Sequence, residues 1–159
     1  MLSLKPKSRY HPTMLTRSLA LLALALAAPA IAAPPAPQIH DVAAADPLRK
    51  ALLDALRPAV AKDLGQPVKF VVTTLRATDG HAFAQVTPQT PAGKPIDFQR
   101  TRYAQQQRNG LLDGDMIHAL LAKEQGRWVV KAFVVAPTDV SWAGWDEEFG
   151  APRALIFPD

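Results

Sequence analysis

The sequence has no cysteine. This absence excludes disulfides, a thiolate nucleophile, zinc sites with cysteine ligands and a lipid-modified cysteine. Serine and histidine are scarce as well, because after residue 32 the only serine is Ser141 and the only histidines are His40, His81 and His118. The fold therefore has to rest on packing, and an enzyme built from this chain would have few nucleophiles and bases.

None of these residues occurs in a pattern typical of catalysis or metal binding. Ser141 lies in no G-x-S-x-G sequence and has no histidine near it in the chain, so we predict that it caps a helix. The histidines do not form H-x-H or H-E-x-x-H, and we predict that His81 and His118 lie on the surface of a sheet. We expect no catalytic residue, no metal site and no cofactor.

A fragment of a calcium-loop pattern begins at Asn109. Asp113, Gly114 and Asp115 follow at the fifth, sixth and seventh positions of such a loop. Its third and twelfth positions are leucines, which provide no oxygen ligand. The turns Asn109-Gly110 and Asp113-Gly114 explain the same residues. We therefore still expect no metal site.

An excess of positive charge is confined to the N-terminus. The chain has 18 lysines and arginines against 14 aspartates and glutamates, but four of the basic residues and none of the acidic ones lie in residues 1–32. Removing these four from the 18 leaves 14 residues of each sign. We therefore predict no binding to nucleic acid, which requires a basic surface.

A long apolar run is also missing. The uncharged apolar run from Leu19 to Ala28 is shorter than the roughly 20 residues that cross a bilayer. It follows basic residues and precedes Ala30-Ile31-Ala32, which is the order of a secretory signal peptide. We predict that residues 1–32 are a signal peptide, that the product is soluble and periplasmic or secreted, and that no stable membrane anchor remains after cleavage. Translation could start at Met1 or Met14, since either gives a basic stretch before the apolar run.

After the signal peptide the chain is predicted to form a tether and one domain. Residues 33–45 are rich in proline and alanine and have little bulky apolar surface, so we predict a disordered tether. Residues 46–159 have the size of one domain. Asp46 can cap a first helical turn, apolar residues then recur at helical spacing, and Gly65 ends the pattern. We expect a long helix from Pro47 to Leu64.

Apolar residues later alternate with period two, as in half-buried strands. Residues 68–77 and 81–87 flank the hairpin turn Asp79-Gly80, and residues 116–123 and 128–135 flank a second hairpin. The predicted fold class is therefore α+β. It has one long N-terminal helix packed on a four-stranded antiparallel sheet of two hairpins, with a short C-terminal helix.

The tryptophans mark the expected core. One apolar face of the last predicted strand is made by Trp128, Val130, Ala132 and Val134. Trp142, Trp145 and Phe149 lie at helical spacing and predict the short C-terminal helix. We expect all three tryptophans to be substantially buried.

The long connection between the hairpins, residues 89–114, is the strongest candidate for a binding site. Between Lys94 and Arg108 it carries several basic residues and two aromatic ones, with Asp97 as the only acid. Such a segment could bind an anionic or flat ligand, either as a short helix over residues 100–108 or as a mobile loop. We predict as ligand-binding residues Arg100, Arg102, Tyr103 and Arg108.

The order of one long helix followed by antiparallel hairpins, over residues 46–135, resembles the cystatin-like and nuclear-transport-factor-like α+β superfold. This superfold includes enzymes, inhibitors and binding modules, so the resemblance implies an architecture without choosing a function. The sequence from Ala136 to Trp142, with Trp145 and Leu155-Ile156-Phe157, is similar to the tail of an uncharacterised secreted protein family of Gram-negative bacteria. That similarity implies no activity.

Two functions are consistent with the sequence. The first is an exported module that binds a small ligand or a protein partner without catalysis, through the long connection and an exposed face of the sheet. The alternative is a small hydrolase or isomerase with a pocket between helix and sheet, using Asp113, Asp115 or His118. A cavity between Leu52, Leu56 and the sheet would favour the enzyme, and a filled interior would favour the binding module.

Overall fold

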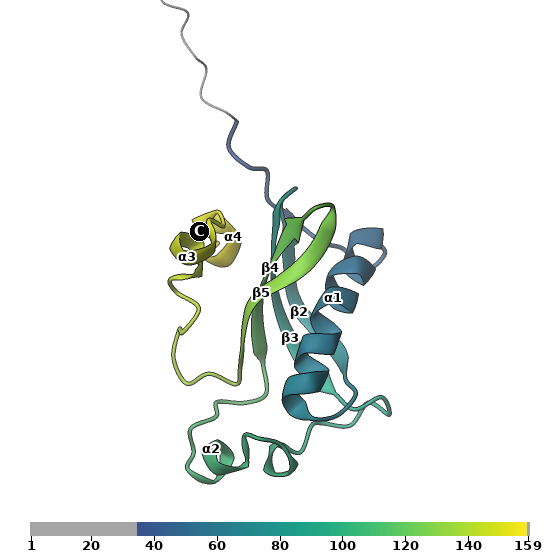
Figure 1. Ribbon diagram of the computed structural model, residues 1–159, viewed down its shortest axis with the longest axis vertical. Coiled ribbons are helices and arrows are strands. Elements are labelled where there is room, and N and C mark those ends of the chain that lie inside the picture. The colour runs from purple at the N-terminus through teal and green to yellow at the C-terminus, as the bar shows by residue number, and fades with distance from the viewer. Residues whose placement is uncertain (1–34, 159) are drawn as a thin grey trace, which may run out of the picture. The chain divides into compact units, whose positions relative to one another are not determined.

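The structure is a computed structural model in which residues 35–158 are described. The predicted signal peptide, residues 1–32, and the first two residues of the predicted tether lie outside the described residues. Within residues 35–158 the chain forms a five-stranded sheet with helices on both faces (Figure 1). The first helix packs on one face of the sheet, and the C-terminal segment packs on the other.

The sheet is an antiparallel meander in which each strand pairs with its neighbours in the sequence. Its strands are β1 (His40–Asp41), β2 (Lys69–Ala77), β3 (His81–Gln89), β4 (Ile117–Glu124) and β5 (Arg127–Val135). The predicted α+β class is confirmed, and both predicted hairpins form. The sheet nevertheless has five strands rather than the predicted four.

The additional strand, β1, comes from the segment that was predicted to be a disordered tether. It pairs with the end of β2, and the residue that follows it, Val42, is buried in the core. The Val42 N–H donates to the Leu75 carbonyl at 2.7 Å. The folded part of the chain therefore begins before Asp46.

The long helix, α1 (Pro47–Leu64), has the limits expected from the sequence, although β1 precedes it. Asp46 accepts the Leu48 N–H at 2.8 Å, and Gly65 ends the helix with a φ of 69° that a glycine adopts without steric cost. The buried face of α1 consists of Leu52, Leu56, Val60 and Leu64. None of the helices in residues 35–158 combines the length and the apolar composition needed to cross a membrane.

β5 contains one extra residue, which divides its side chains between the two faces of the sheet. Leu120 pairs with Ala132 and Leu121 pairs with Val130, so Lys131 has no partner opposite it. Because successive side chains of a strand point to opposite faces, such a bulge reverses the faces that the following side chains reach. Trp128 and Val130 pack on the α1 side, whereas Ala132 and Val134 pack on the other side. The single apolar face predicted for these four residues is wrong.

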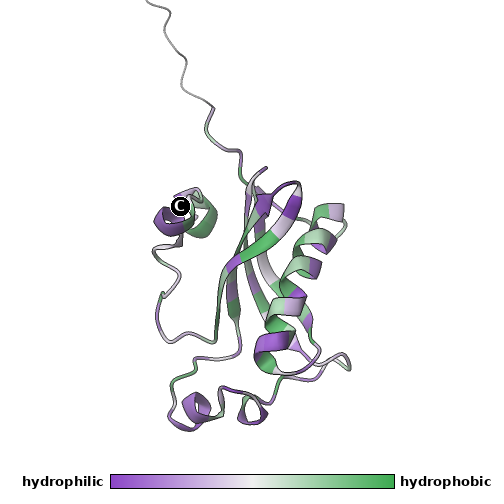
Figure 2. Cartoon of the chain, in the orientation of Figure 1, coloured by the Kyte–Doolittle hydropathy of each residue, from purple (hydrophilic) through white to green (hydrophobic). Residues whose placement is uncertain are grey.

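The face opposite α1 is covered by residues 137–158, which we name the C-terminal cover. It contains α3 (Trp145–Phe149) and α4 (Arg153–Ile156), and its side next to the sheet is hydrophobic (Figure 2). The apolar cluster that it forms consists of Phe83 and Leu120 from the sheet and Trp145, Ala151, Leu155 and Ile156 from the cover. The sheet face that we expected to be exposed is therefore buried, and the cover occupies the place of the expected partner.

Two polar side chains of the sheet bind main-chain carbonyls of the cover. Arg76 donates to the carbonyl oxygens of Ala154 and Leu155 at 2.8 and 3.2 Å. The Nε2 atom of His81 lies 3.2 Å from the carbonyl oxygen of Phe149. These carbonyls belong to the last turns of short helices and have no partner further along their own helix. The sheet thus fixes the cover by hydrogen bonds as well as by apolar contact.

The cover differs from the single C-terminal helix predicted from the sequence. α3 starts only after Gly144, with no side-chain bond at its N-terminus, so Ser141 does not cap it. The predicted stop at Gly150 is confirmed by its φ of 66°, but Pro152 then precedes a second helix. The prediction of buried tryptophans holds for Trp145, whereas Trp128 and Trp142 are only half-buried.

Leu155→Ala should lower the free energy of unfolding by about 2–5 kcal/mol, because this leucine is 0% exposed between the cover and the sheet. The matched control is Val140→Ala, in the same segment but 58% exposed, which should change it by less than about 0.5 kcal/mol. Urea denaturation followed by tryptophan fluorescence measures both. Small and equal effects would show that the cover does not pack on the sheet.

Candidate functional site

The space between α1 and the sheet is filled by side chains. Leu52 and Leu56 are fully buried and belong to one hydrophobic cluster with residues of β2, β3 and β4. Neither leucine lines any of four surface pockets that lie within residues 35–158. The pocket beneath the helix that the enzyme alternative requires is therefore not found at these leucines.

Two of the predicted ligand-binding residues are held by one carboxylate of α1. Arg102 donates to one oxygen of Asp63 at 2.7 Å, and the Tyr103 hydroxyl donates to the other at 2.6 Å. The Asp63 side chain is only 12% exposed, so these two bonds replace water that the carboxylate has lost. Burial, together with the adjacent carboxylate, raises the pKa of Tyr103 above its usual range and keeps its hydroxyl a donor.

The connection that carries these residues is ordered by two short helices, η1 (Phe98–Arg100) and α2 (Ala104–Arg108). Phe98 is buried, and its ring meets the Tyr103 ring edge-to-face, with centroids 6.2 Å apart and planes at 88°. The helix predicted over residues 100–108 is thus confined to its second half. Apolar packing and the Asp63 bonds together fix the connection against α1.

The four predicted ligand-binding residues do not converge on one site. Arg100 lines a separate pocket of about 320 Å³ between the end of α1 and the start of the connection. Arg108 donates to Gln105 within α2 at 2.8 Å. Only Arg102 and Tyr103 come together, and they do so at a carboxylate of the protein itself.

Arg102 also lines a groove between α1 and β5, which we name the α1–β5 groove. Its volume is about 350 Å³, and its other lining residues are Ala59, Lys62, Asp63 and Phe133. Ala59 and Phe133 are apolar, whereas Lys62 and Arg102 are basic. Within residues 35–158 the Arg102 charge is paired with Asp63, but Lys62 forms no ion pair. The groove combines an apolar lining with one uncompensated positive charge.

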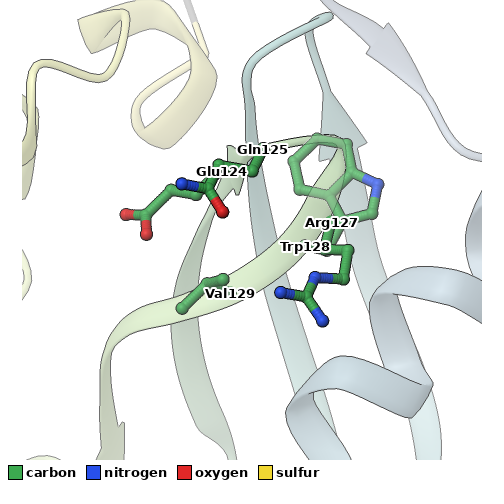
Figure 3. Close-up of a pocket in the computed structure, with 5 residues that line it drawn as sticks. All are labelled: Glu124, Gln125, Arg127, Trp128 and Val129. Carbon is green, nitrogen blue, oxygen red and sulfur yellow. The ribbon is translucent and has the colours of Figure 1, made fainter.

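A second hollow, the hairpin hollow, lies at the turn between β4 and β5 (Figure 3). Its volume is about 440 Å³, and it is lined by Glu124, Gln125, Arg127, Trp128 and Val129. In Figure 3 the Glu124 carboxylate and the Arg127 guanidinium lie apart from each other. The hollow therefore has charges of both signs on separate sides, beside the exposed Val129 and the half-buried Trp128 ring.

His118 is buried between β4 and the C-terminal cover, which corrects its predicted place on the sheet surface. It is 7% exposed, and its ring stacks on Trp142 with centroids 3.7 Å apart and planes at 8°. Its Nδ1 atom has no hydrogen-bond partner among the described residues. Burial lowers the pKa of His118 below its usual range, because desolvation disfavours the charged ring.

The residues of the catalytic alternative do not share a pocket. Asp113 is exposed and Asp115 is half-buried, whereas His118 is enclosed by the cover. None of the three lines any of the four pockets described in residues 35–158. In the same part of the chain, no three histidine or acidic residues are arranged to hold a metal ion.

Asp63, Lys62 and Phe133 were not predicted as site residues. Asp63 meets its partner Tyr103 across 40 positions of the chain, and no spacing rule links residues so far apart. One signal was available, because an acidic residue in the last turn of a helix opposes the helix dipole and so suggests a cation nearby. Phe133 could not be placed on the groove side, since the bulge at Lys131 determines its face.

Arg102→Glu should destabilise the protein by at least about 1 kcal/mol, because it replaces an ion pair with two like charges at a mostly buried carboxylate. Arg100→Glu and Arg108→Glu are the matched controls in the same connection, since neither arginine forms an ion pair within residues 35–158. Thermal unfolding followed by circular dichroism compares the three. Equal melting temperatures would contradict a structural role for Arg102.

The free energy of unfolding should fall as the pH is lowered below about 6.5, the ordinary pKa of histidine. The unfolded chain then binds a proton at His118 more readily than the folded chain, so acid favours unfolding. The contribution of neutral His118 to the free energy of unfolding is complete above about pH 6.5. It is lost as the pH falls through the lowered pKa of His118 in the folded state. Urea denaturation at about pH 7.5 and pH 5 should show a smaller loss for His118→Phe than for the wild type. Equal losses would assign the pH dependence to other groups.

A function could be carried to this chain from a similar protein of known activity. The expected likeness to the cystatin-like superfold could likewise be tested by a solved structure with the same arrangement of elements. Comparison of the chain with protein-family models, with curated proteins and with solved structures finds no match.

Proposed function

We propose that this chain is an exported module that binds a partner without catalysing a reaction, and that the α1–β5 groove is its binding site. The proposal is supported by the contrast between the filled interior beneath α1 and the open groove beside it. Binding pockets are mostly apolar, with a few polar groups that orient the ligand, and the groove has this composition.

The lining of the groove indicates the chemistry of the ligand. Phe133 and Ala59 offer contact to an apolar group, while Lys62 offers an ammonium that has no partner within residues 35–158. Arg102 uses one N–H for Asp63 and retains donors at its 66% exposed side chain. We infer a ligand with an apolar group and a carboxylate a few ångströms apart, either a small molecule or part of a protein.

Export is part of the same proposal and is supported only by the sequence of residues 1–32. The basic, apolar and small-residue regions follow one another there in the order of a secretory signal peptide. The proposed architecture, similar to the cystatin-like and nuclear-transport-factor-like superfold, is supported by a long helix lying across an antiparallel sheet. Neither point identifies the ligand.

The hydrolase or isomerase alternative lacks this support. A general base must reach its substrate, but His118 lies beneath Trp142 and its ring is stacked on the indole. Neither Asp113 nor Asp115 lines a described pocket in which a substrate could be held. A binding role therefore remains the better supported proposal.

The groove can be tested with phenylpropanoate, which has an aromatic ring and a carboxylate, and with phenylpropylamine as the control of opposite charge. In an NMR titration, phenylpropanoate should shift the amide signals of Ala59, Lys62 and Phe133, whereas the amine should not. Lys62→Glu should weaken the binding at least about fivefold, which corresponds to one exposed ion pair.

The matched variant is Lys69→Glu, which changes an exposed lysine of β2 that does not line the groove. It should bind phenylpropanoate as the wild type does. Shifts centred on the pocket of Arg100, or equal binding of the amine, would place recognition elsewhere and contradict the proposal.

A further inference from the structure

β5 is the exposed edge of the sheet. In the described part of the chain it pairs only with β4, and no loop or side chain bonds to the main chain of residues 127–134 from outside that pairing. About half of the N–H and C=O groups of an edge strand point outward and are free to pair with another chain. At nine residues β5 is long for an edge, whereas the opposite edge, β1, has two.

The two hollows of the site lie along this edge. Val129 belongs to the hairpin hollow and Phe133 to the α1–β5 groove. The two residues point to opposite faces, because Val129 alternates with Trp128 and Val130, which pack on the α1 side, whereas Phe133 itself packs on that side. Successive side chains of an added strand also point to opposite faces, so a strand paired with β5 would carry side chains toward both hollows.

The edge is positively charged. β5 contains Arg127 and Lys131 and no acidic residue, and the groove beside it adds Lys62. Glu124 bonds to Lys131 at 2.8 Å, but it is half exposed and leaves the other two basic groups uncompensated. Opposite charges on paired strands stabilise a sheet, so the edge favours a strand with acidic side chains.

A second copy of the chain does not fit this edge. Full antiparallel pairing of two β5 strands about a two-fold axis would place Lys131 opposite Lys131, and like charges in that position are destabilising. The extra residue at Lys131 also interrupts the ladder, which is a common protection against pairing between identical edges. The same basic residues that repel a second copy of β5 attract a strand with acidic side chains. Repulsion between identical edges therefore helps β5 to select a different partner.

We propose that β5 binds an extended segment of a partner protein as a sixth strand, in which acidic residues alternate with apolar ones. The inference rests on the proposed function, since an apolar residue of the added strand occupies the α1–β5 groove. The acidic residues of that strand point to the opposite face of the sheet, toward Arg127 and Lys131. Main-chain hydrogen bonds to β5 provide affinity, and the two hollows select the side chains.

The probe is a synthetic nine-residue peptide of alternating glutamate and valine with one central phenylalanine, capped at both ends. Two peptides are its controls: the same sequence with alternate amides N-methylated, and the same sequence with lysine in place of glutamate. Isothermal titration calorimetry measures affinity, and NMR records cross-strand contacts with β5. N-methylation should weaken binding at least about tenfold, since it removes two or more hydrogen bonds of about 1 kcal/mol each.

The outcomes separate strand addition from groove binding. Cross-strand contacts along residues 127–135, loss of binding on N-methylation and weaker binding to Lys131→Glu, but not to Lys69→Glu, support strand addition. Peptide binding that survives N-methylation overturns strand addition and leaves the groove proposal intact. Binding of phenylpropanoate without binding of the peptide also overturns strand addition and leaves the groove proposal intact. Equal binding of the lysine peptide, or a dimer through β5 in sedimentation analysis, also overturns it.

Discussion

The described part of the chain depends on the pairing of β3 with β4, because these two strands are buried on both faces. On one face Ala84 and Ala119 are opposite each other and pack beneath α1. On the other, Phe83 and Leu120 are opposite each other and pack beneath the C-terminal cover. A sheet with two apolar faces must be covered twice, so neither the helix nor the cover is dispensable.

Sequence periodicity predicts the elements of this fold better than their faces. The limits of α1 follow from a capping aspartate and a terminal glycine, which are local signals that packing does not override. The face reached by Phe133 depends instead on the extra residue at Lys131, and a bulge leaves no regular mark in a strand sequence. The two-residue strand β1 is too short to show any period, and it forms because β2 offers an edge.

The candidate site was predictable only in part. Composition drew attention to Arg102 and Tyr103, which do lie together, but it could not show that Asp63 already binds both. Excess positive charge in a connection is therefore a poor guide to a free anion site when the acid that compensates it lies on a distant helix. The apolar lining of the groove escaped notice for another reason, since the bulge at Lys131 brings Phe133 to the α1 side and only the fold places it beside Ala59.

The C-terminal cover also affects the order in which this protein can fold. The ribosome makes it after the whole sheet, although its Phe149 carbonyl binds His81, 68 residues earlier in the chain. Contacts so distant in sequence form slowly, and here they cannot form before the ribosome has passed Phe149. Until Leu155 and Ile156 emerge, the apolar surface of Phe83 and Leu120 faces solvent or other chains. A nascent chain that pauses after β5 and before α4 is thus the form most prone to aggregate or to require a chaperone.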